Sequence, residues 1–278
     1  MTSEAPASPA TTTPVAGAVF ERILVGIDET PESLVAAAQA AVLRASLGQL
    51  VLVAIAERHL AAHAGLAATD AAELIDAGTW QDLVRAREIV AADDAILHTG
   101  RLVRVLVRER ERRGATLVAI GARPRRHGAA LALGGHDVEA LRHIPCSVLI
   151  ARPGWGLRPP ERIVVGVDGL HESRAAELVA RQLAERLGCE LVPVIGLADT
   201  FDLALLRTEL DDALLDPGRL VDAVAGTATR ASLVVLGAGV LAARGKHHSL
   251  VEQIVFGVSC SVLALRDEPV AHRDPASG

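Results

Sequence analysis

Short apolar runs alternate with longer segments of helical period along most of this chain. The apolar runs hold five or six residues, mostly Val, Ile and Leu, as strands do when helices cover both of their faces. The segments between them repeat apolar residues every three to four positions, which is typical of amphipathic helices. Strands that alternate with helices are joined by right-handed crossovers, so the pattern predicts an α/β fold with parallel sheet.

The pattern also predicts where each element lies. In the first half we expect strands at 22–27, 50–55, 95–98, 116–120 and 147–151, and helices at 31–47, 68–93, 101–113 and 135–143. In the second half we expect strands at 162–167, 190–195, 213–216, 232–236 and 261–265, with a short second helix at 201–211.

The beginnings of the two halves are copies of one another. The segment RILVGID at 22–28 returns as RIVVGVD at 162–168. In both copies an Ala-rich amphipathic helix follows and runs to a Leu-Gly pair, which ends at Gly48 in the first half and at Gly188 in the second. The repeat predicts that both halves open with the same strand and helix.

The ends of the two halves match as well. ATLVAIG at 115–121 corresponds to ASLVVLG at 231–237, and CSVL at 146–149 corresponds to the same four letters at 260–263. Because all the matched blocks occur in the same order, they predict two similar domains in tandem.

The boundaries of these domains follow from the repeat and from a Pro- and Gly-rich stretch between the copies. We expect a disordered tail at 1–19, a first domain at 20–152, a linker at 153–160, a degenerate second domain at 161–268 and a tail at 269–278.

The composition is that of a globular protein with an unusual core. Of the 278 residues 50% are hydrophobic and 2% are aromatic, so small aliphatic side chains must fill the interior. No apolar run reaches the ~20 residues that cross a bilayer. The net charge of −6 gives no general attraction to nucleic acid or to anionic membrane, and neither is expected as a partner.

The cysteine content and the N-terminus favour the cytoplasm. Cys146, Cys189 and Cys260 are an odd number without Cys-x2-Cys spacing, which argues against a disulfide scaffold or a zinc site. The first residues lack the charged and apolar regions of a secretory signal. We expect Cys146 and Cys260, at the start of apolar strands, to be buried and inert.

Candidate chemistry lies where the expected strands end, because ligands of open parallel sheets bind beyond the carboxyl ends of strands. Asp28 and Asp168 directly follow the first strand of each half, and loops begin at Gly121 and Gly237. A carboxylate at such a place can accept a hydrogen bond from a ribose hydroxyl or hold Mg²⁺. The alternative is that Asp28 caps the following helix.

These residues, with the block LRHIPCSVLIAR at 141–152, resemble the universal stress protein family over nearly the whole region 20–267, twice over. The resemblance implies two doubly wound, five-stranded parallel-sheet domains of the adenine nucleotide α-hydrolase-like kind. It further implies that the two copies associate by pseudo-twofold symmetry like a family homodimer, so we expect strands 147–151 and 261–265 to meet across the axis. A homodimer of the whole chain is a further option.

Many members of this family bind ATP through Gly-x2-Gly-x9-Gly-(Ser/Thr), whereas others lack the motif. Laid on the first half, the motif falls on Gly121, Pro124, Gly134 and Gly135, of which Gly121 and Gly134 match. Pro124 removes a backbone donor, and Gly135 stands in place of a hydroxyl. Asp137, where a second hydroxyl is common, would repel a phosphate.

The nucleoside end of the motif is intact. The resemblance implies nucleotide-binding roles for seven residues of the first half: Ile27, Asp28, Ile55, Gly121, Arg123, Gly134 and Gly135. Ile55 stands at the position that packs on adenine. Arg125, Arg126 and His127 make the adjoining loop basic, so arginines either replace the missing donors or form a solvated loop.

The second half departs further from the motif. Val240 and His248 replace glycines, Ser249 keeps the hydroxyl, and Gly196 stands where the first half has Ile55. We therefore expect any adenine nucleotide, ATP or a relative, in the first half, with no cofactor required for the fold.

Three functions remain open. The first is a non-catalytic stress-response module with a small nucleotide or proteins as partners, since no nucleophile motif such as Gly-x-Ser-x-Gly is present. The second is an ATP-hydrolysing or nucleotidyl-transferring enzyme of the related fold, and the third is a protein-interaction module without nucleotide. No catalytic residue or metal ligand is assigned, because adjacent His247 and His248 cannot chelate one ion together.

Two further features have packing interpretations. Charges at i,i+4 spacing in 101–113, such as Arg108–Arg112 and Glu109–Arg113, predict an exposed face of mixed charge rather than a nucleic-acid stripe. Trp155 in the linker is expected to anchor one domain on the other.

Overall fold

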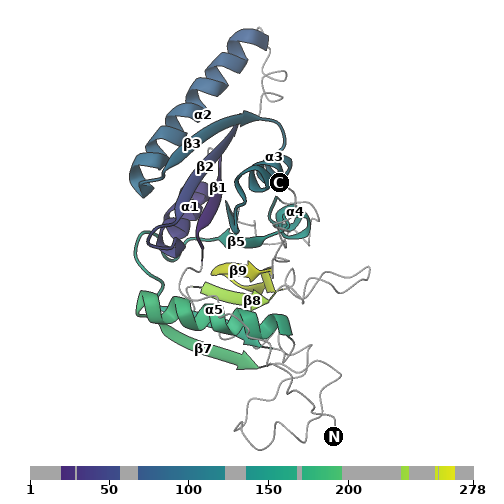
Figure 1. The fold of residues 1–278 in the computed structure, drawn as a ribbon. Coiled ribbons are helices and arrows are strands. Elements are labelled where there is room, and N and C mark those ends of the chain that lie inside the picture. The colour runs from purple at the N-terminus through teal and green to yellow at the C-terminus, as the bar shows by residue number, and fades with distance from the viewer. Residues whose placement is uncertain are drawn as a thin grey trace, which may run out of the picture.

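The computed structural model (Figure 1) describes residues 20–28, 30–56, 68–122, 136–167, 171–195, 233–237, 254–255 and 257–266. The elements in chain order are β1 (Arg22–Ile27), α1 (Pro31–Leu43), β2 (Gln49–Ala56), α2 (Ala68–Val90), β3 (Asp94–Thr99), α3 (Leu102–Arg113), β4 (Leu117–Gly121), α4 (His136–His143), β5 (Ser147–Ala151), β6 (Arg162–Val167), α5 (His171–Leu187), β7 (Glu190–Ile195), β8 (Leu233–Gly237) and β9 (Ser261–Leu265).

The strands form one sheet in the order β3-β2-β1-β4-β5-β9-β8-β6-β7. Within each half all pairs are parallel, and β5 and β9 pair antiparallel where the halves meet. The prediction of doubly wound parallel α/β structure is confirmed. The strand expected at 213–216, the helix at 201–211 and both tails lie outside the described residues.

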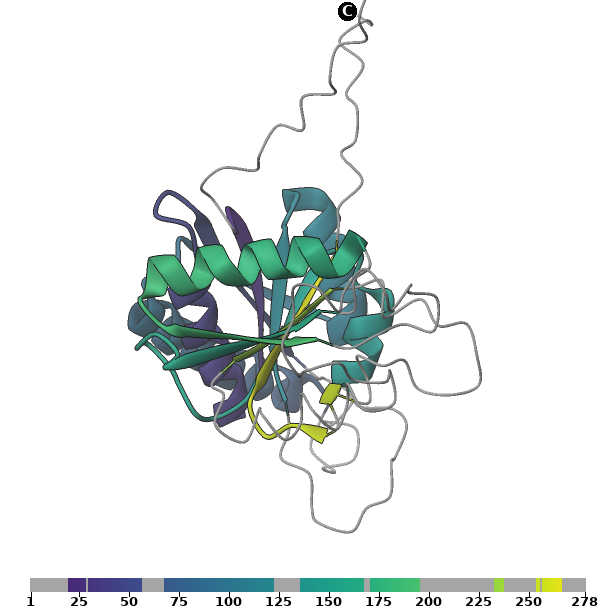
Figure 2. The same cartoon turned by 90° about the horizontal axis from the view of Figure 1, so that it is seen from below.

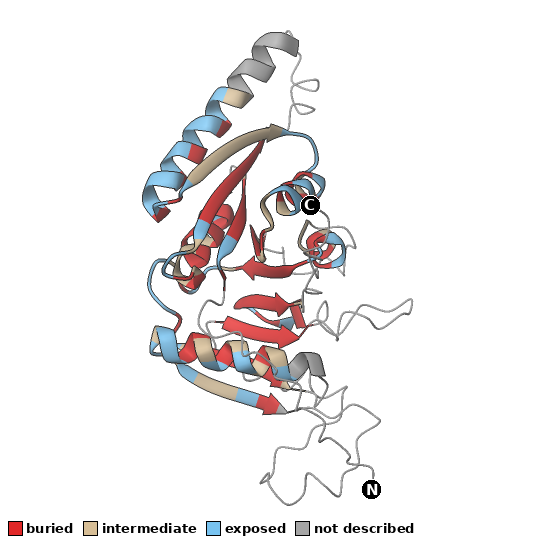
Figure 3. Ribbon diagram, in the orientation of Figure 1, coloured by how far each residue is buried: buried red, intermediate tan, exposed pale blue. Residues whose placement is uncertain are grey.

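Two apolar layers cover the sheet. Alternate strand residues pack with α1, α2 and α5 on one face, and the others pack with α3, α4 and residues 254–255 on the opposite face. Figure 2 shows α5 lying over the strands of the second half. The central strands are buried, whereas the outer strands β3 and β7 are partly exposed (Figure 3).

Two helices are shorter than their periodicity predicts. We expected the first to run to residue 47, but α1 ends at Leu43 because the chain turns there and the Ala45 N–H bonds to the Phe20 carbonyl at 3.0 Å. We expected the second to run to 93, but α2 ends at Val90, since Ala91 adopts a left-handed φ of 49°. The spacing of apolar residues alone does not show at which residue the helix ends.

The closing strands meet across a pseudo-twofold axis, as predicted. Leu149 is opposite Leu263, its own counterpart in the repeat. The Arg152 N–H donates to the Ser261 hydroxyl at 3.0 Å, and the Arg266 N–H donates to the Ser147 hydroxyl at 3.2 Å. Reciprocal contacts of this kind define an isologous interface, here within a single chain.

The two arginines repeat this reciprocity through their guanidinium groups. Arg152 donates to the carbonyls of Val255 at 2.8 Å and of Cys260 at 3.0 Å in the second half. Arg266 donates to the carbonyl of Leu141, which is the counterpart of Val255, in the first half. Each half thus satisfies main-chain acceptors of the other.

Other contacts between the halves are not repeated. The buried Gln39 amide of α1 accepts from the Ser261 hydroxyl of the second half at 2.8 Å, and it donates to the carbonyls of Arg152 in its own half at 2.8 Å and of Trp155 in the linker at 2.9 Å. Arg186 of α5 donates to the Leu43 carbonyl at the end of α1 at 2.8 Å. Trp155 itself is buried in the layer that holds α1 and α5.

Candidate functional site

The carboxyl ends of three neighbouring strands bring four of the candidate residues to one edge of the sheet. Ile27 ends β1 and Asp28 follows it directly. Ile55 lies at the end of β2, and Gly121 ends β4. Ile27 is in register with Ala54, so Ile55 extends one residue beyond it. Arg123, Gly134 and Gly135 lie outside the described residues, as does the basic loop.

The Asp28 carboxylate shapes the turn that leads into α1. Its Oδ1 atom accepts a hydrogen bond from the Thr30 N–H at 3.0 Å and another from the Thr30 hydroxyl. The Ser33 hydroxyl closes the turn by donating to the carbonyl oxygen of Asp28 at 2.8 Å. The helix then starts at Pro31, a position where a missing N–H costs no hydrogen bond. Asp28 therefore has a structural task at the helix start, whatever else it binds.

Gly121 is required by the packing of β4 on α1. A Cβ atom there would lie 2.4 Å from the Glu32 carbonyl carbon and 2.7 Å from the Ser33 nitrogen. No real Cβ approaches backbone so closely, so any other residue would push the first turn of α1 away from the strand. The glycine thus sets the distance between the end of β4 and the start of α1.

Ile27 and Ile55 lie on opposite faces of the sheet. Ile27 is 1% exposed and packs in the layer of α1 and α2, whereas Ile55 is 6% exposed and packs in the layer of α3. A ligand that touches both side chains must therefore lie over the strand ends rather than along one face.

A cavity of about 210 Å³ opens beside Asp28 on the side of α2. It is lined by Asp28, Thr30, Pro31, Leu34, Asp82 and Arg85. Asp82 and Arg85 are on one face of α2 and bring a carboxylate and a guanidinium next to the strand end. No pattern in the sequence marks these two residues, because only the packing of α2 against β2 and α1 brings them near Asp28.

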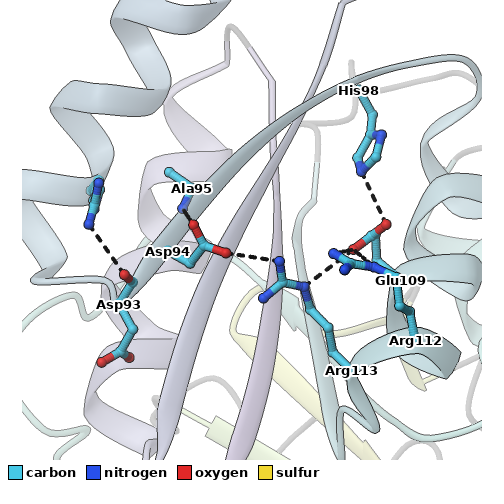
Figure 4. Close-up of polar contacts among 8 residues, drawn as sticks. Asp93, Asp94, Ala95, His98, Glu109, Arg112 and Arg113 are labelled. Atoms are coloured by element: carbon cyan, nitrogen blue, oxygen red, sulfur yellow. Dashed lines mark hydrogen bonds and ion pairs between the residues drawn. The ribbon is translucent and has the colours of Figure 1, made fainter.

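A polar cluster joins β3 to α3 next to Ile55 (Figure 4). Glu109 is 3% exposed and lies 2.6 Å from the Arg112 guanidinium, 3.3 Å from Arg113 Nε and 3.1 Å from His98 Nε2. Arg113 also reaches Asp94 at 2.8 Å. Burial raises the pKa of Glu109, but the hydrogen bonds from Arg112 and Arg113 outweigh it, so the pKa lies below its usual value.

This cluster corrects one prediction. We expected Glu109 on an exposed face of mixed charge, but it points inward, where His98 of β3 is its partner, while Arg112 and Arg113 of the same helix also reach it. The sequence signal that marks this is weak: Glu109 follows the buried Val105 and Leu106 at helical spacing.

Cys146 and Cys260 are buried, as predicted, and burial raises the pKa of Cys260 to about 11. In the part of the chain that the structure describes, no helix meets the length and hydropathy of a bilayer span.

The strand order of the first half reverses between β1 and β4, next to Asp28, and this defines a doubly wound α/β protein. Residues 20–152 match the model of the Universal stress protein family. This segment is therefore a universal stress protein domain. No curated protein sequence matches the chain.

Solved structures share the fold over both halves. A universal stress protein from Archaeoglobus fulgidus is similar with a TM-score of 0.67 at 13% identity, over 91% of this chain and 98% of that one. A functionally unknown protein from Pseudomonas aeruginosa PAO1 is similar with a TM-score of 0.61 at 19% identity, over 89% of this chain and 92% of that one. At these identities the likeness concerns the fold alone.

Proposed function

We propose that this chain is a non-catalytic stress-response module that binds an adenine nucleotide, ATP or a relative, in its first half. The observation that carries the proposal is the convergence of Asp28, Ile55 and Gly121 on one edge of the sheet, at the reversal of strand order. The membership of residues 20–152 in the universal stress protein family supports it.

The geometry suggests how each residue would act. The base would lie over the strand ends, where Ile55 offers an apolar contact, because that residue and Ile27 face opposite sides of the sheet. The Asp28 carboxylate would accept hydrogen bonds from ribose hydroxyls in addition to those from Thr30. Phosphates would extend toward the loop that holds Arg123, Gly134 and Gly135.

We also propose a compartment and partners for this module and an arrangement of its two halves. The module would act in the cytoplasm with a small nucleotide, with proteins, or with both. An intramolecular pseudodimer would form from its two halves, 20–152 and 161–268, which the linker 153–160 joins. The module would bind the nucleotide without hydrolysing or transferring it.

Ligand-induced stabilisation tests the proposal. The full chain is heated with ATP, ADP, AMP or cyclic AMP while unfolding is followed. A nucleotide at about 100 times its Kd stabilises the folded state by about 2.7 kcal/mol, and the melting temperature rises accordingly. No shift with any of the four nucleotides contradicts the proposal.

A matched pair of variants locates the site. Asp28→Ala is expected to abolish the nucleotide-induced shift, and Asp168→Ala, the same change in the other half, is expected to retain it. The shift is measured relative to each variant without nucleotide, because loss of the Asp28 turn also lowers stability. Equal shifts in both variants would exclude the first-half edge as the site.

A further inference from the structure

The outward face of α3 carries a row of arginines. Arg104, Arg108 and Arg112 follow one another at four-residue spacing and are all exposed, and Arg101 precedes them at the N-cap. Residues at this spacing lie on one helix face, so the three span about 12 Å of it. These four residues are called the arginine stripe.

The inward turn of Glu109 leaves this face positive. Glu109 is buried, and Glu111 is the remaining exposed carboxylate of α3. Within the described residues no carboxylate pairs with Arg104 or Arg108, and Arg101 reaches Glu139 at a distant 3.8 Å. Arg112 differs, because it binds Glu109 at 2.6 Å. The mixed charge of the sequence thus separates into a carboxylate inside and guanidinium groups outside.

The first three arginines of the stripe do not serve the stability of their own helix. Arg101 and Arg104 stand at the N-terminus, where the helix dipole favours negative charge, and the first turn holds no acidic residue. Arg104, Arg108 and Arg112 also repel one another at i,i+4 spacing. Arg101 and Arg104 disfavour the start of this helix, and Arg108 has no carboxylate partner among the described residues. On a chain of net charge −6 these three guanidinium groups indicate a function outside the fold.

We propose that the arginine stripe docks an acidic helix of a protein partner, with carboxylates at four-residue spacing facing Arg104 and Arg108, while Arg112 stays bound to Glu109 at the end of the stripe. Arginine suits this role, because its planar guanidinium binds a carboxylate through two parallel hydrogen bonds. The net charge of −6 opposes a long polyanion such as DNA, and α3 carries no aromatic side chain for stacking on bases.

A labelled peptide tests this surface on the full chain. The probe is a helical peptide with glutamates along one face, and fluorescence anisotropy measures its binding at low salt. The double variant Arg104→Gln/Arg108→Gln is expected to bind it about tenfold more weakly, and added salt is expected to weaken wild-type binding. The variant should fold at least as well as the wild type, because it removes repulsion.

Two controls make the test specific. Arg158→Gln/Arg174→Gln changes the net charge equally at exposed positions away from α3 and is expected to bind like the wild type. A peptide of the same composition, with glutamates spread around the helix, is expected to bind more weakly.

Three results would overturn the proposal: no binding of the patterned peptide, equal loss in both double variants, or tighter binding of a mixed-sequence DNA duplex. These results do not depend on nucleotide binding, because the stripe shares no residue with the edge at Asp28.

Discussion

Where the closing strands β5 and β9 of the two halves meet, several hydrogen bonds occur twice, whereas the outer strands and the ligand-side edges of the halves differ. Ser147 and Ser261 accept hydrogen bonds from the main chain of Arg266 and Arg152 in the opposite half. A residue near a pseudo-twofold axis faces its own counterpart, so a change in one half disturbs both. This explains why the closing segments of the repeat remain alike.

The ligand-side edges have no such constraint. The first half has Ile55 at the end of its second strand, and the second half has Gly196 at the matching place. The two edges lie apart in the sheet, because β1 and β6 are separated by four other strands. Each can therefore change without affecting the other, and the repeat can keep its interface while one site changes.

The outer strands differ in a similar way. β3 is tied to α3 by Asp94, His98 and the cluster around Glu109. β7 instead carries an exposed proline, Pro193, which cannot donate a hydrogen bond to a further strand. The first half thus holds its outer strand with buried charge, whereas the second half has a strand that resists further pairing.

The largest expected effect is at the pseudo-twofold axis. Leu149→Ala and Leu263→Ala are each expected to lower the free energy of unfolding by about 2–5 kcal/mol, because both side chains are fully buried. Urea denaturation of the full chain measures it. Since the two residues pair in register, the double variant should depart from additivity by about 0.5–3 kcal/mol. Very unequal single effects, or strict additivity, would contradict the symmetry.

An intermediate effect is expected at the ligand-side edge. Gly121→Ala should lower stability by about 1–3 kcal/mol, because its Cβ would collide with the backbone of Glu32 and Ser33. Gly78→Ala on α2 is the matched control: its Cβ would meet open space, and it should raise stability by about 0.5–1 kcal/mol. Thermal unfolding compares them. A neutral Gly121→Ala would mean that α1 does not pack on β4 so closely.

The smallest effect concerns the outer edge of the first half and depends on pH. The folded-state pKa of Glu109 lies below its ordinary value of 4.5, so its carboxylate adds stability above that pH, which is lost as pH falls through the folded-state value. Glu109→Gln should therefore be less stable than the wild type at neutral pH, and the difference should shrink in acid.

Urea unfolding from neutral to acid pH measures this difference. Glu111→Gln, an exposed change on the same helix, is the control for the general loss of a negative charge. A difference for Glu109→Gln that stays constant with pH would show that the buried carboxylate does not bind its arginines more tightly in the folded state.

Much of the fold could be predicted because the information is local. Continuous apolar runs identified the strands, and the repeat predicted that Leu149 and Leu263 belong to equivalent strands. The ends of α1 and α2 could not be predicted, because a hydrogen bond from Ala45 to Phe20 and the left-handed Ala91 end the helices while the apolar period continues.

The candidate site divides in the same way. Asp28, Ile55 and Gly121 could be predicted, because each stands at the end of a recognisable parallel strand, and such ends share one edge. Their use as nucleotide contacts remains a prediction. Asp82 and Arg85 could not be predicted, because they reach Asp28 through the packing of a helix whose side chains have no fixed relation to the strand in sequence.

By itself the sequence determined the class of fold, the repeat and the residues at the strand ends, since these follow from period, order and strand direction. The tertiary structure alone decided that Glu109 points inward, that Gly121 leaves room for α1 and that Ile27 and Ile55 face opposite layers. The physical reason is that burial and close approach depend on which surfaces pack together. Residues far apart in sequence supply those surfaces, and for this reason the positive face of α3 became visible only in the folded chain.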